Sequence, residues 1–172
     1  NLMFGLKVLE SALNNDVKTF INTDSFLPRE LNIYSLSKKQ LVDWLKQMSS
    51  RIKIINLKLE HMYGPKDDTN KFLAWLISQF KENVAEIKLT SGIQKRDFVY
   101  IDDIISAFTT VIKKQNLLPQ FSEFEVGTGQ SIEVRFFVQT LKEVYEQTNG
   151  KLKLKSKLNF GAIPYRDGEI ME

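Results

Sequence analysis

The chain has 172 residues, of which 42% are hydrophobic and 26% charged, a composition typical of a folded globular protein that excludes a disordered segment. The net charge is only +3, with the basic residues scattered among 21 acidic ones, so the charge does not indicate a nucleic-acid partner. There is no cysteine and only one histidine, which excludes disulfide bonds and argues against a metal centre. No signal peptide is visible, and no apolar run approaches the roughly 20 residues that cross a bilayer. We therefore expect a cytoplasmic protein with no metal and no membrane partner.

The first third of the chain alternates between helical and extended patterns. Residues 1–15 have leucines near helical spacing, residues 17–22 are a short β-prone run, and the polar residues 23–25 are expected to end it. A helix is predicted from Asn32 or Ser35 to about residue 50. Its buried stripe is expected to be Leu41, Trp44, Leu45 and Met48, with Lys39, Asp43 and Lys46 facing solvent. Residues 52–59 are dense in Ile and Leu, which is typical of a strand covered on both faces.

The same alternation continues to the C-terminus. Helices are predicted at 71–81, 102–114 and 132–147, and strands at 86–89, 98–101 and 121–126. The inward residues are expected to be Phe72, Trp75, Leu76 and Phe80 in the first of these helices, and Val134, Phe137, Val138, Leu141 and Val144 in the last. Residues 151–160 alternate lysine and leucine, from Lys151 and Leu152 onward, and favour an amphipathic strand. Strands that alternate with helices predict an α/β fold with a parallel sheet.

One pair of residues in the second helix has a specific chemical meaning. Tyr34 and Lys38 are four residues apart and therefore lie on one helical face. An ammonium close to a phenol favours the phenolate, and such a tyrosine can exchange a proton with a carbonyl or an alcohol. The spacing occurs by chance in many helices, so its meaning depends on the rest of the chain. The carboxyl ends of parallel strands, where ligands bind in such sheets, are expected to hold Thr23, Asp24, Ser25, His61 and Tyr63.

Seven blocks in fixed order together resemble the second half of the extended short-chain dehydrogenase/reductase family, of the NAD-dependent epimerase/dehydratase type. They are Asn1 with Gly5, residues 20–25, residues 34–38 (Tyr-x-x-x-Lys), residues 57–65 ending in Tyr-Gly-Pro, residues 96–103 (Arg-Asp-Phe), residues 127–129 (Gly-Thr-Gly) and residues 166–169 (Arg-x-Gly-Glu). The resemblance implies the second half of a Rossmann-like doubly wound sheet plus part of a small C-terminal substrate domain. Residues 1–65 and about 96–128 would belong to the dinucleotide-binding part, and about 66–95 and 130–172 to the substrate-binding part.

The resemblance implies roles around a ketone or alcohol. Tyr34 would be the general acid, Lys38 would tune it and bind the nicotinamide ribose, and Ser25 or Thr23 would be the second hydroxyl donor. Counting along the strand favours Ser25, whereas a Thr-Asp pair in related dehydratases favours Thr23; the other of the two would cap the strand end. We expect Asp24 to cap a turn, although a proton-handling role toward substrate is the alternative.

The remaining roles concern cofactor and substrate contacts. Tyr63 and Gly64 would approach the nicotinamide amide. His61 would contact the sugar nucleotide, or serve only a structural purpose. Arg96 and Arg166 would clamp the diphosphate with planar, bidentate guanidinium groups. The alternative for Arg96 is an ion pair with Asp97 or Asp103, and Gly127-Thr128-Gly129 is expected to be a structural turn.

Residues 20–27, 58–65 and 94–98 are most similar to the CDP-abequose synthase group of that family. This resemblance implies an NADPH- or NADH-dependent reductase of the C4 ketone of a nucleotide-linked 4-keto-6-deoxyhexose in O-antigen (lipopolysaccharide) biosynthesis, acting as a homodimer. A 4-epimerase, a 4,6-dehydratase, or a non-catalytic sugar-nucleotide-binding module are the alternatives. The glycine-rich dinucleotide turn of the family is absent from the 172 residues. We therefore expect that about one hundred preceding residues are missing, and that the chain by itself is inactive.

Overall fold

The computed structural model describes residues 1–150 and 153–172, and these divide into two compact units. Unit 1 contains Asn1–Met62 and Val99–Gly127, and unit 2 contains Tyr63–Phe98 and Thr128–Glu172. The chain crosses between the units three times, within the short strands β3 (His61–Tyr63) and β6 (Phe98–Tyr100) and after Gly127. Each unit has hydrophobic core residues of its own.

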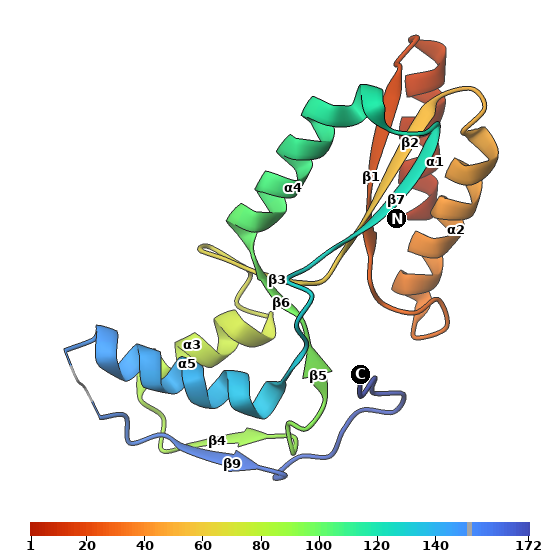
Figure 1. Cartoon of the computed structure of the whole chain (residues 1–172). Helices are drawn as coiled ribbons and strands as arrows, with labels where there is room; N and C mark the ends of the chain where they lie inside the picture. Colours follow the sequence, from red (N-terminus) through yellow and green to blue (C-terminus); the bar gives the residue numbers. More distant parts are fainter. Residues whose placement is uncertain (151–152) are drawn as a thin grey trace. The chain divides into compact units, whose positions relative to one another are not determined.

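A parallel three-stranded sheet forms the centre of unit 1 (Figure 1). Its strands are β1 (Thr19–Ser25), β2 (Lys53–Leu59) and β7 (Phe121–Val126), in the order β1-β2-β7. β2 is the central strand, and Ile54, Ile55 and Leu57 within it are completely buried. The Ile- and Leu-rich segment is therefore a strand covered on both faces, which confirms the prediction of a parallel sheet.

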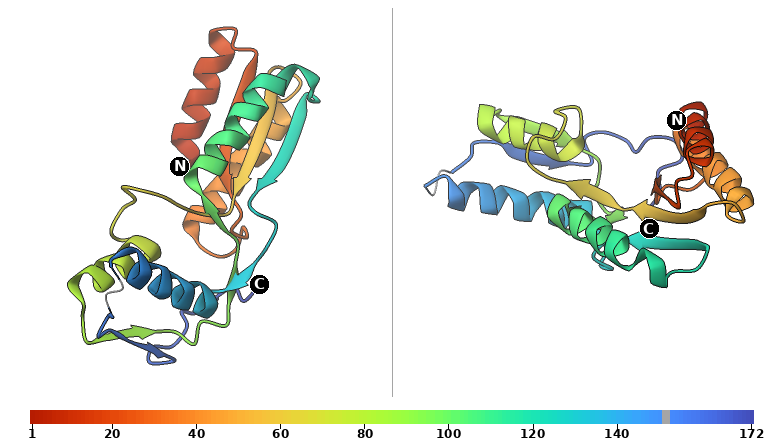
Figure 2. Two further views of the ribbon diagram at one scale, coloured as in Figure 1. Left: turned by 60° about the vertical axis from the view of Figure 1, so that its left-hand side comes forward. Right: turned by 90° about the horizontal axis from the view of Figure 1, so that it is seen from above.

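Helices cover both faces of this sheet (Figure 2). α1 (Leu2–Asn14) and α2 (Ile33–Met48) lie on one face, and α4 (Ile101–Lys114), followed by the 3-10 helix η1 (Gln115–Leu117), lies on the other. α1 and α2 pack closely at Gly5, where an added Cβ would lie 2.4 Å from a methyl carbon of Leu41. The small residue at this position is therefore required by the helix crossing.

Unit 1 differs from the sequence prediction in two places. β1 does not end at Asn22 but continues through Ser25, because Thr23, Asp24 and Ser25 all pair with β2. Trp44 is 50% exposed and does not belong to the buried stripe of α2, where Leu41, Val42 and Leu45 are buried instead. A helical pattern cannot fix the width of the covered face, since that depends on how the neighbouring helix packs.

Unit 2 consists of α3 (Phe72–Glu82) and α5 (Val134–Thr148) packed on a parallel pair of strands, β4 (Glu86–Leu89) and β9 (Lys157–Phe160) (Figure 1). A second, antiparallel pair joins β5 (Lys95–Arg96) to β8 (Ile132–Glu133). The core is made of Leu76, Phe80, Ile87, Leu89, Val134, Val138 and Leu154. Phe98 stacks on Phe137 with ring centroids 3.8 Å apart, which secures α5 against the start of β6.

Three predictions for unit 2 need correction or limitation. Phe72 and Val144 are 38% and 47% exposed and therefore do not face inward. Residues 153–156 are not part of a strand, and β9 begins only at Lys157. The predicted extension through Lys151 and Leu152 lies outside the described residues. Within residues 1–150 and 153–172, no helix has both the length and the apolar character needed to cross a membrane.

Candidate functional site

The N-terminus of α2 is fixed by a reciprocal pair of hydrogen bonds. Asn32 Oδ1 accepts from the backbone N–H of Ser35 at 2.9 Å, and Ser35 Oγ accepts from the backbone N–H of Asn32 at 3.1 Å. This capping box selects Asn32, of the two residues that the sequence left open, as the residue that starts the helix. Because Ser35 is fully buried, the box also holds the first turn, which carries Tyr34.

Replacing the cap should therefore weaken the turn that carries Tyr34. We expect Asn32→Ala to lower the free energy of unfolding by about 1 kcal/mol, because the N–H of Ser35 loses its acceptor. Urea unfolding followed by circular dichroism measures this loss. Gln47→Ala, an exposed change in the same helix, is the control and should shift the midpoint very little. Equal shifts for the two variants would show that the cap contributes nothing.

Tyr34 and Lys38 lie together on one face of α2. Lys38 Nζ is 5.9 Å from the centroid of the Tyr34 ring, which is 46% exposed. The same ammonium donates to the backbone oxygen of Thr23 at 2.7 Å, so it links the helix to the carboxyl half of β1. Partial burial lowers the pKa of Lys38, against the opposing attraction of the Asp24 carboxylate. The arrangement places a cation beside a phenol that is open to a reactant.

The two candidate hydroxyls at the end of β1 differ in what they contact. Ser25 Oγ accepts a hydrogen bond from the backbone N–H of Leu27 at 3.2 Å and thereby caps the turn after the strand. Thr23 is exposed, and its backbone oxygen is the acceptor for Lys38. Alternation along β1 puts the side chains of Thr23 and Ser25 on the same face of the strand. The local geometry thus leaves the Thr23 hydroxyl the more accessible of the two.

Asp24 and Lys39 are placed differently from the prediction. The Asp24 side chain is completely buried, and its Oδ2 lies 2.7 Å from Lys39 Nζ. The turn-cap prediction for Asp24 and the solvent-facing prediction for Lys39 are therefore both wrong: only 17% of the Lys39 side chain is exposed. The signal that could have found the pair is the period of two along β1, which puts Asp24 on the face of Phe20, where α2 packs.

A row of hydrogen-bonded polar side chains crosses the sheet on the face that carries Asp24. This row was not predicted from the sequence. Asn22 Nδ2 donates to Asn56 Oδ1 at 2.7 Å, and Asn56 Nδ2 donates to a carboxylate oxygen of Glu123 at 2.8 Å. Lys58 Nζ lies 2.8 Å from the other oxygen of Glu123. The contacts lower the pKa of Glu123 despite partial burial, which alone would raise it, and they raise the pKa of Lys58. These hydrogen bonds satisfy the buried side-chain amides of Asn22 and Asn56 on this face of the sheet.

In unit 2, one carboxylate holds both of the arginines that the sequence singled out. Arg96 forms an ion pair with Glu169, and Arg166 Nε lies 2.8 Å from the second oxygen of the same residue. Arg96 is largely buried, with 11% of its side chain exposed, whereas Arg166 is 62% exposed. The two guanidinium groups are thus close enough to share one anionic group.

Asp97, one of the two alternative partners considered for Arg96, binds the turn after β7. Asp97 Oδ1 accepts from the Thr128 hydroxyl at 2.6 Å, and Asp97 Oδ2 accepts from the backbone N–H of Gly129 at 2.8 Å. The carboxylate therefore shapes the Gly127-Thr128-Gly129 segment, where Gly129 has a positive φ of 77°. This geometry is that of a structural turn and not of a phosphate loop.

A tyrosine that the sequence did not single out fastens the segment that carries Arg166. The Tyr165 hydroxyl lies 2.5 Å from the Ser91 hydroxyl, accepts from the backbone N–H of Ile93 at 3.1 Å, and donates to Gln94 Oε1 at 2.9 Å. Desolvation would raise the pKa of Tyr165, but the hydrogen bonds from the Ser91 hydroxyl and from nearby backbone N–H groups lower it. The residues before Arg96 and those before Arg166 are therefore joined at one point.

The remaining candidates from the sequence are His61, Tyr63 and Gly64. His61 is half-buried, with Nδ1 3.5 Å from a carboxylate oxygen of Glu60. Tyr63 packs edge-to-face on Phe137 at 6.2 Å and leads into Gly64. Among residues 1–150 and 153–172, no three histidine, aspartate or glutamate side chains are grouped as metal ligands.

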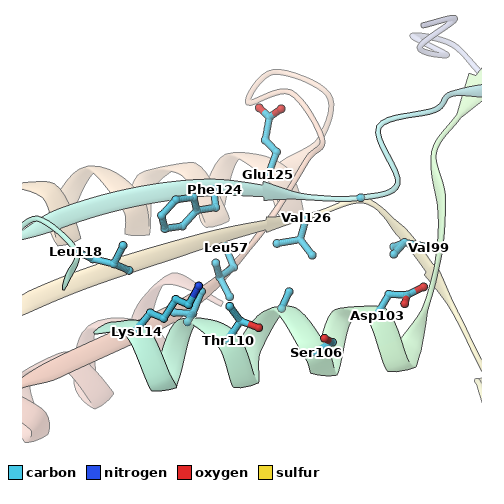
Figure 3. A pocket seen from close by; sticks show the side chains of 13 residues that line it. Leu57, Val99, Asp103, Ser106, Thr110, Lys114, Leu118, Phe124, Glu125 and Val126 are labelled. Atoms are coloured by element: carbon cyan, nitrogen blue, oxygen red, sulfur yellow. The ribbon is translucent and has the colours of Figure 1, made fainter. Parts of the chain in front are cut away.

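A hollow of about 480 Å³ lies in unit 1 between α4 and the strands β2 and β7 (Figure 3). Its walls are mostly apolar, with Leu57, Phe124 and Val126 on the sheet side and the polar residues Ser106, Thr110 and Lys114 on α4. No candidate catalytic or binding residue lines it. It shows only that α4 covers this edge of the sheet incompletely.

Comparison with known sequences gives a family match over most of the chain. The model of the NAD dependent epimerase/dehydratase family matches residues 1–127. The chain is 36% identical to the CDP-abequose synthase of Salmonella muenchen over 100% of its own length, and 32% identical to that of Salmonella typhimurium over 99%. It spans only 59% and 58% of the lengths of these relatives.

Solved structures support the fold. The UDP-N-acetylglucosamine 4-epimerase from Methanobrevibacter ruminantium M1, in complex with UDP-N-acetylmuramic acid, superimposes with a TM-score of 0.82 at 19% identity, covering 99% of this chain and 58% of that one. A UDP-glucose 4-epimerase from Thermotoga maritima, with UDP-glucose, gives a TM-score of 0.79 at 22% identity over 97% of this chain and 57% of that one. The doubly wound, parallel α/β architecture is thereby confirmed. By its sequence match and its fold, the chain belongs to the NAD dependent epimerase/dehydratase family.

Proposed function

We propose that these residues are part of an NAD(P)-dependent sugar-nucleotide oxidoreductase that reduces the C4 ketone of a nucleotide-linked 4-keto-6-deoxyhexose. The single observation that carries the proposal is the position of Lys38, whose ammonium lies 5.9 Å from the exposed Tyr34 ring. The similarity to CDP-abequose synthases along the whole chain supports the substrate class.

In this proposal, the proton is transferred by side chains of α2. NADPH or NADH, when bound, supplies the hydride to the carbonyl carbon. Tyr34 donates its phenolic proton to the carbonyl oxygen, and the Lys38 ammonium stabilises the phenolate that remains. Thr23, exposed at the strand end, donates a hydrogen bond to the same oxygen, while Ser25 caps the turn.

The described residues fit a nicotinamide cofactor in part. Lys38 is a partly desolvated cation with hydrogen-bonding capacity beside an open phenol, which suits a ribose hydroxyl. Tyr63 and Gly64 are proposed to approach the carboxamide, as the family resemblance implies. No glycine-rich pyrophosphate turn occurs in the 172 residues, so the proposal concerns only the nicotinamide end.

In this proposal, residues of unit 2 bind the phosphates of the substrate. Arg96 and Arg166 converge on one carboxylate, and two planar guanidinium groups so arranged suit the oxygens of a diphosphate. His61 is proposed to contact the sugar nucleotide. Asp24 is a poor substrate ligand because its carboxylate is completely buried, and the same burial disfavours it as the acid of a dehydratase.

The test uses the longest open reading frame that contains these residues. Purified protein mixed with NADPH and CDP-4-keto-6-deoxyglucose should consume NADPH in proportion to the deoxysugar formed. A 4-epimerase or a 4,6-dehydratase would convert its substrate without net loss of NADPH, because it returns the hydride. A non-catalytic binding module would bind the sugar nucleotide in calorimetry and convert nothing. Either result would contradict the proposal.

We also propose that a second copy of the chain covers the outer face of α1. Met3 and Phe4 are 67% and 75% exposed there, and Met3 shares a groove of about 480 Å³ with Trp44 of α2. Large apolar side chains so exposed mark interaction surfaces, and one patch on each copy can pair with itself about a two-fold axis.

A charge on this face should therefore prevent pairing. Phe4→Glu is expected to convert a dimer into a monomer, because the carboxylate would be buried against an apolar partner. Light scattering coupled to size exclusion measures the mass. Ile105→Glu, at a 55% exposed apolar residue on α4, is the matched control and should leave the mass unchanged. A monomeric parent protein would contradict the proposal.

A further inference from the structure

Two consecutive lysines of α2 contact three consecutive residues of β1. Lys38 Nζ donates to the backbone oxygen of Thr23 at 2.7 Å. Lys39 Nζ contacts Asp24 Oδ2 at 2.7 Å and the backbone oxygen of Ser25 at 2.5 Å. The helix that carries Tyr34 is therefore attached to the carboxyl end of the strand at two adjacent points.

The buried carboxylate of Asp24 has one close cationic partner although other lysines lie nearby. Lys58 is engaged by Glu123 at 2.8 Å. The Asp24 carboxylate also attracts the Lys38 ammonium: it raises the pKa of Lys38, whereas the nearby Lys39 ammonium lowers the pKa of Lys38. Lys39 and Lys38 are thus the two α2 ammonium groups that the same carboxylate attracts, and Lys39 holds it.

We propose that Lys39 is a positioning residue: by neutralising the buried Asp24 carboxylate, it leaves Lys38 on the Thr23 backbone oxygen and beside Tyr34. A buried carboxylate without its partner is costly, and attraction in a poorly solvated site acts strongly over several ångströms. Without Lys39, the ammonium of Lys38 is drawn toward Asp24 and away from the phenol. The inference rests on the proposed proton-transfer function of Tyr34.

The surroundings of Asp24 keep its carboxylate in place for this role. Asn56 Nδ2 lies 3.4 Å from the oxygen that Lys39 contacts, and Asn56 is itself held by Asn22 and Glu123. Within residues 1–150 and 153–172, Asp24 Oδ1 has no hydrogen-bond partner, so the carboxylate depends on the groups at Oδ2. Lys39 is the only ammonium within salt-bridge distance of that oxygen among the described residues.

The experiment compares reduction by four variants of the protein encoded by the longest open reading frame. Lys39→Met should lower kcat about tenfold or more with KM for the sugar nucleotide within about twofold, because a displaced catalytic group loses rate and not ground-state binding. Lys39→Arg should keep most of the activity. The double variant Asp24→Asn/Lys39→Met removes the competing carboxylate and should return kcat to within about threefold of the parent. Arg29→Met, which removes the exposed ion pair between the segment preceding α2 and Asp43 of α2, is the matched control and should change neither constant.

The outcomes separate the inference from the function on which it rests. Parental kcat in Lys39→Met overturns the positioning role, and so does an equal loss in the single and double variants, since that is what a merely structural contact predicts. If Lys39→Met does not fold, Lys39→Gln carries the same expectation, because an amide remains a polar hydrogen-bond donor but has no charge to neutralise Asp24. A parent protein that reduces no 4-keto sugar nucleotide refutes the proposed function itself, and the inference falls with it.

Discussion

Tyr34→Phe is expected to lower the rate of ketone reduction about a thousandfold, because it removes the group that protonates the carbonyl oxygen. The ring remains, so its contact with Lys38 and the stability of α2 should be retained. The measurement is the single-turnover rate of NADPH oxidation together with the dissociation constant of the sugar nucleotide, which should stay within about threefold.

The control for this variant is Tyr145→Phe. That residue packs on Phe80 in unit 2, with ring centroids 5.6 Å apart, and removal of its hydroxyl should not change the rate. If Tyr34→Phe reduced the ketone at a rate near that of the parent, Tyr34 would not be the acid. The proton would then have to come from another group or from water.

Leu45→Ala should lower the free energy of unfolding by about 3 kcal/mol, since Leu→Ala changes at fully buried sites leave a cavity that neighbours fill incompletely. Leu45 is fully buried between α2 and the sheet, in the cluster with Leu9, Leu41 and Ile54. Chemical denaturation followed by circular dichroism measures the loss.

Ile33→Ala tests whether the effect comes from burial. Ile33 lies on the same helix but is 85% exposed, so its truncation should change the free energy of unfolding by less than about 0.5 kcal/mol. Similar losses for Leu45→Ala and Ile33→Ala would mean that the covered face of α2 is not the one described.

Much of the architecture could be predicted because it depends on local patterns. The continuous Ile-Leu run at 52–59 is the central strand β2, since only a strand covered on both faces tolerates so few polar residues. The polar residues Asn32 and Ser35 marked where α2 begins, although only the structure selected Asn32 as the cap. Val144 and Trp44 were placed wrongly, because periodicity gives the direction of the apolar stripe and not the extent of the surface that covers it.

The same distinction between local patterns and tertiary contacts applies to the candidate site. The sequence by itself determined the residues that depend on order and spacing: the Tyr34-x-x-x-Lys38 face, the two arginines and the family to which the chain belongs. The ion pair of Lys39 with Asp24 and the shared carboxylate of Glu169 were decided only by the tertiary structure. The physical reason is that the pairs Lys39–Asp24 and Arg96–Glu169 join residues 15 and 73 positions apart, which only the tertiary fold brings together, whereas a spacing of four is fixed by the helix itself.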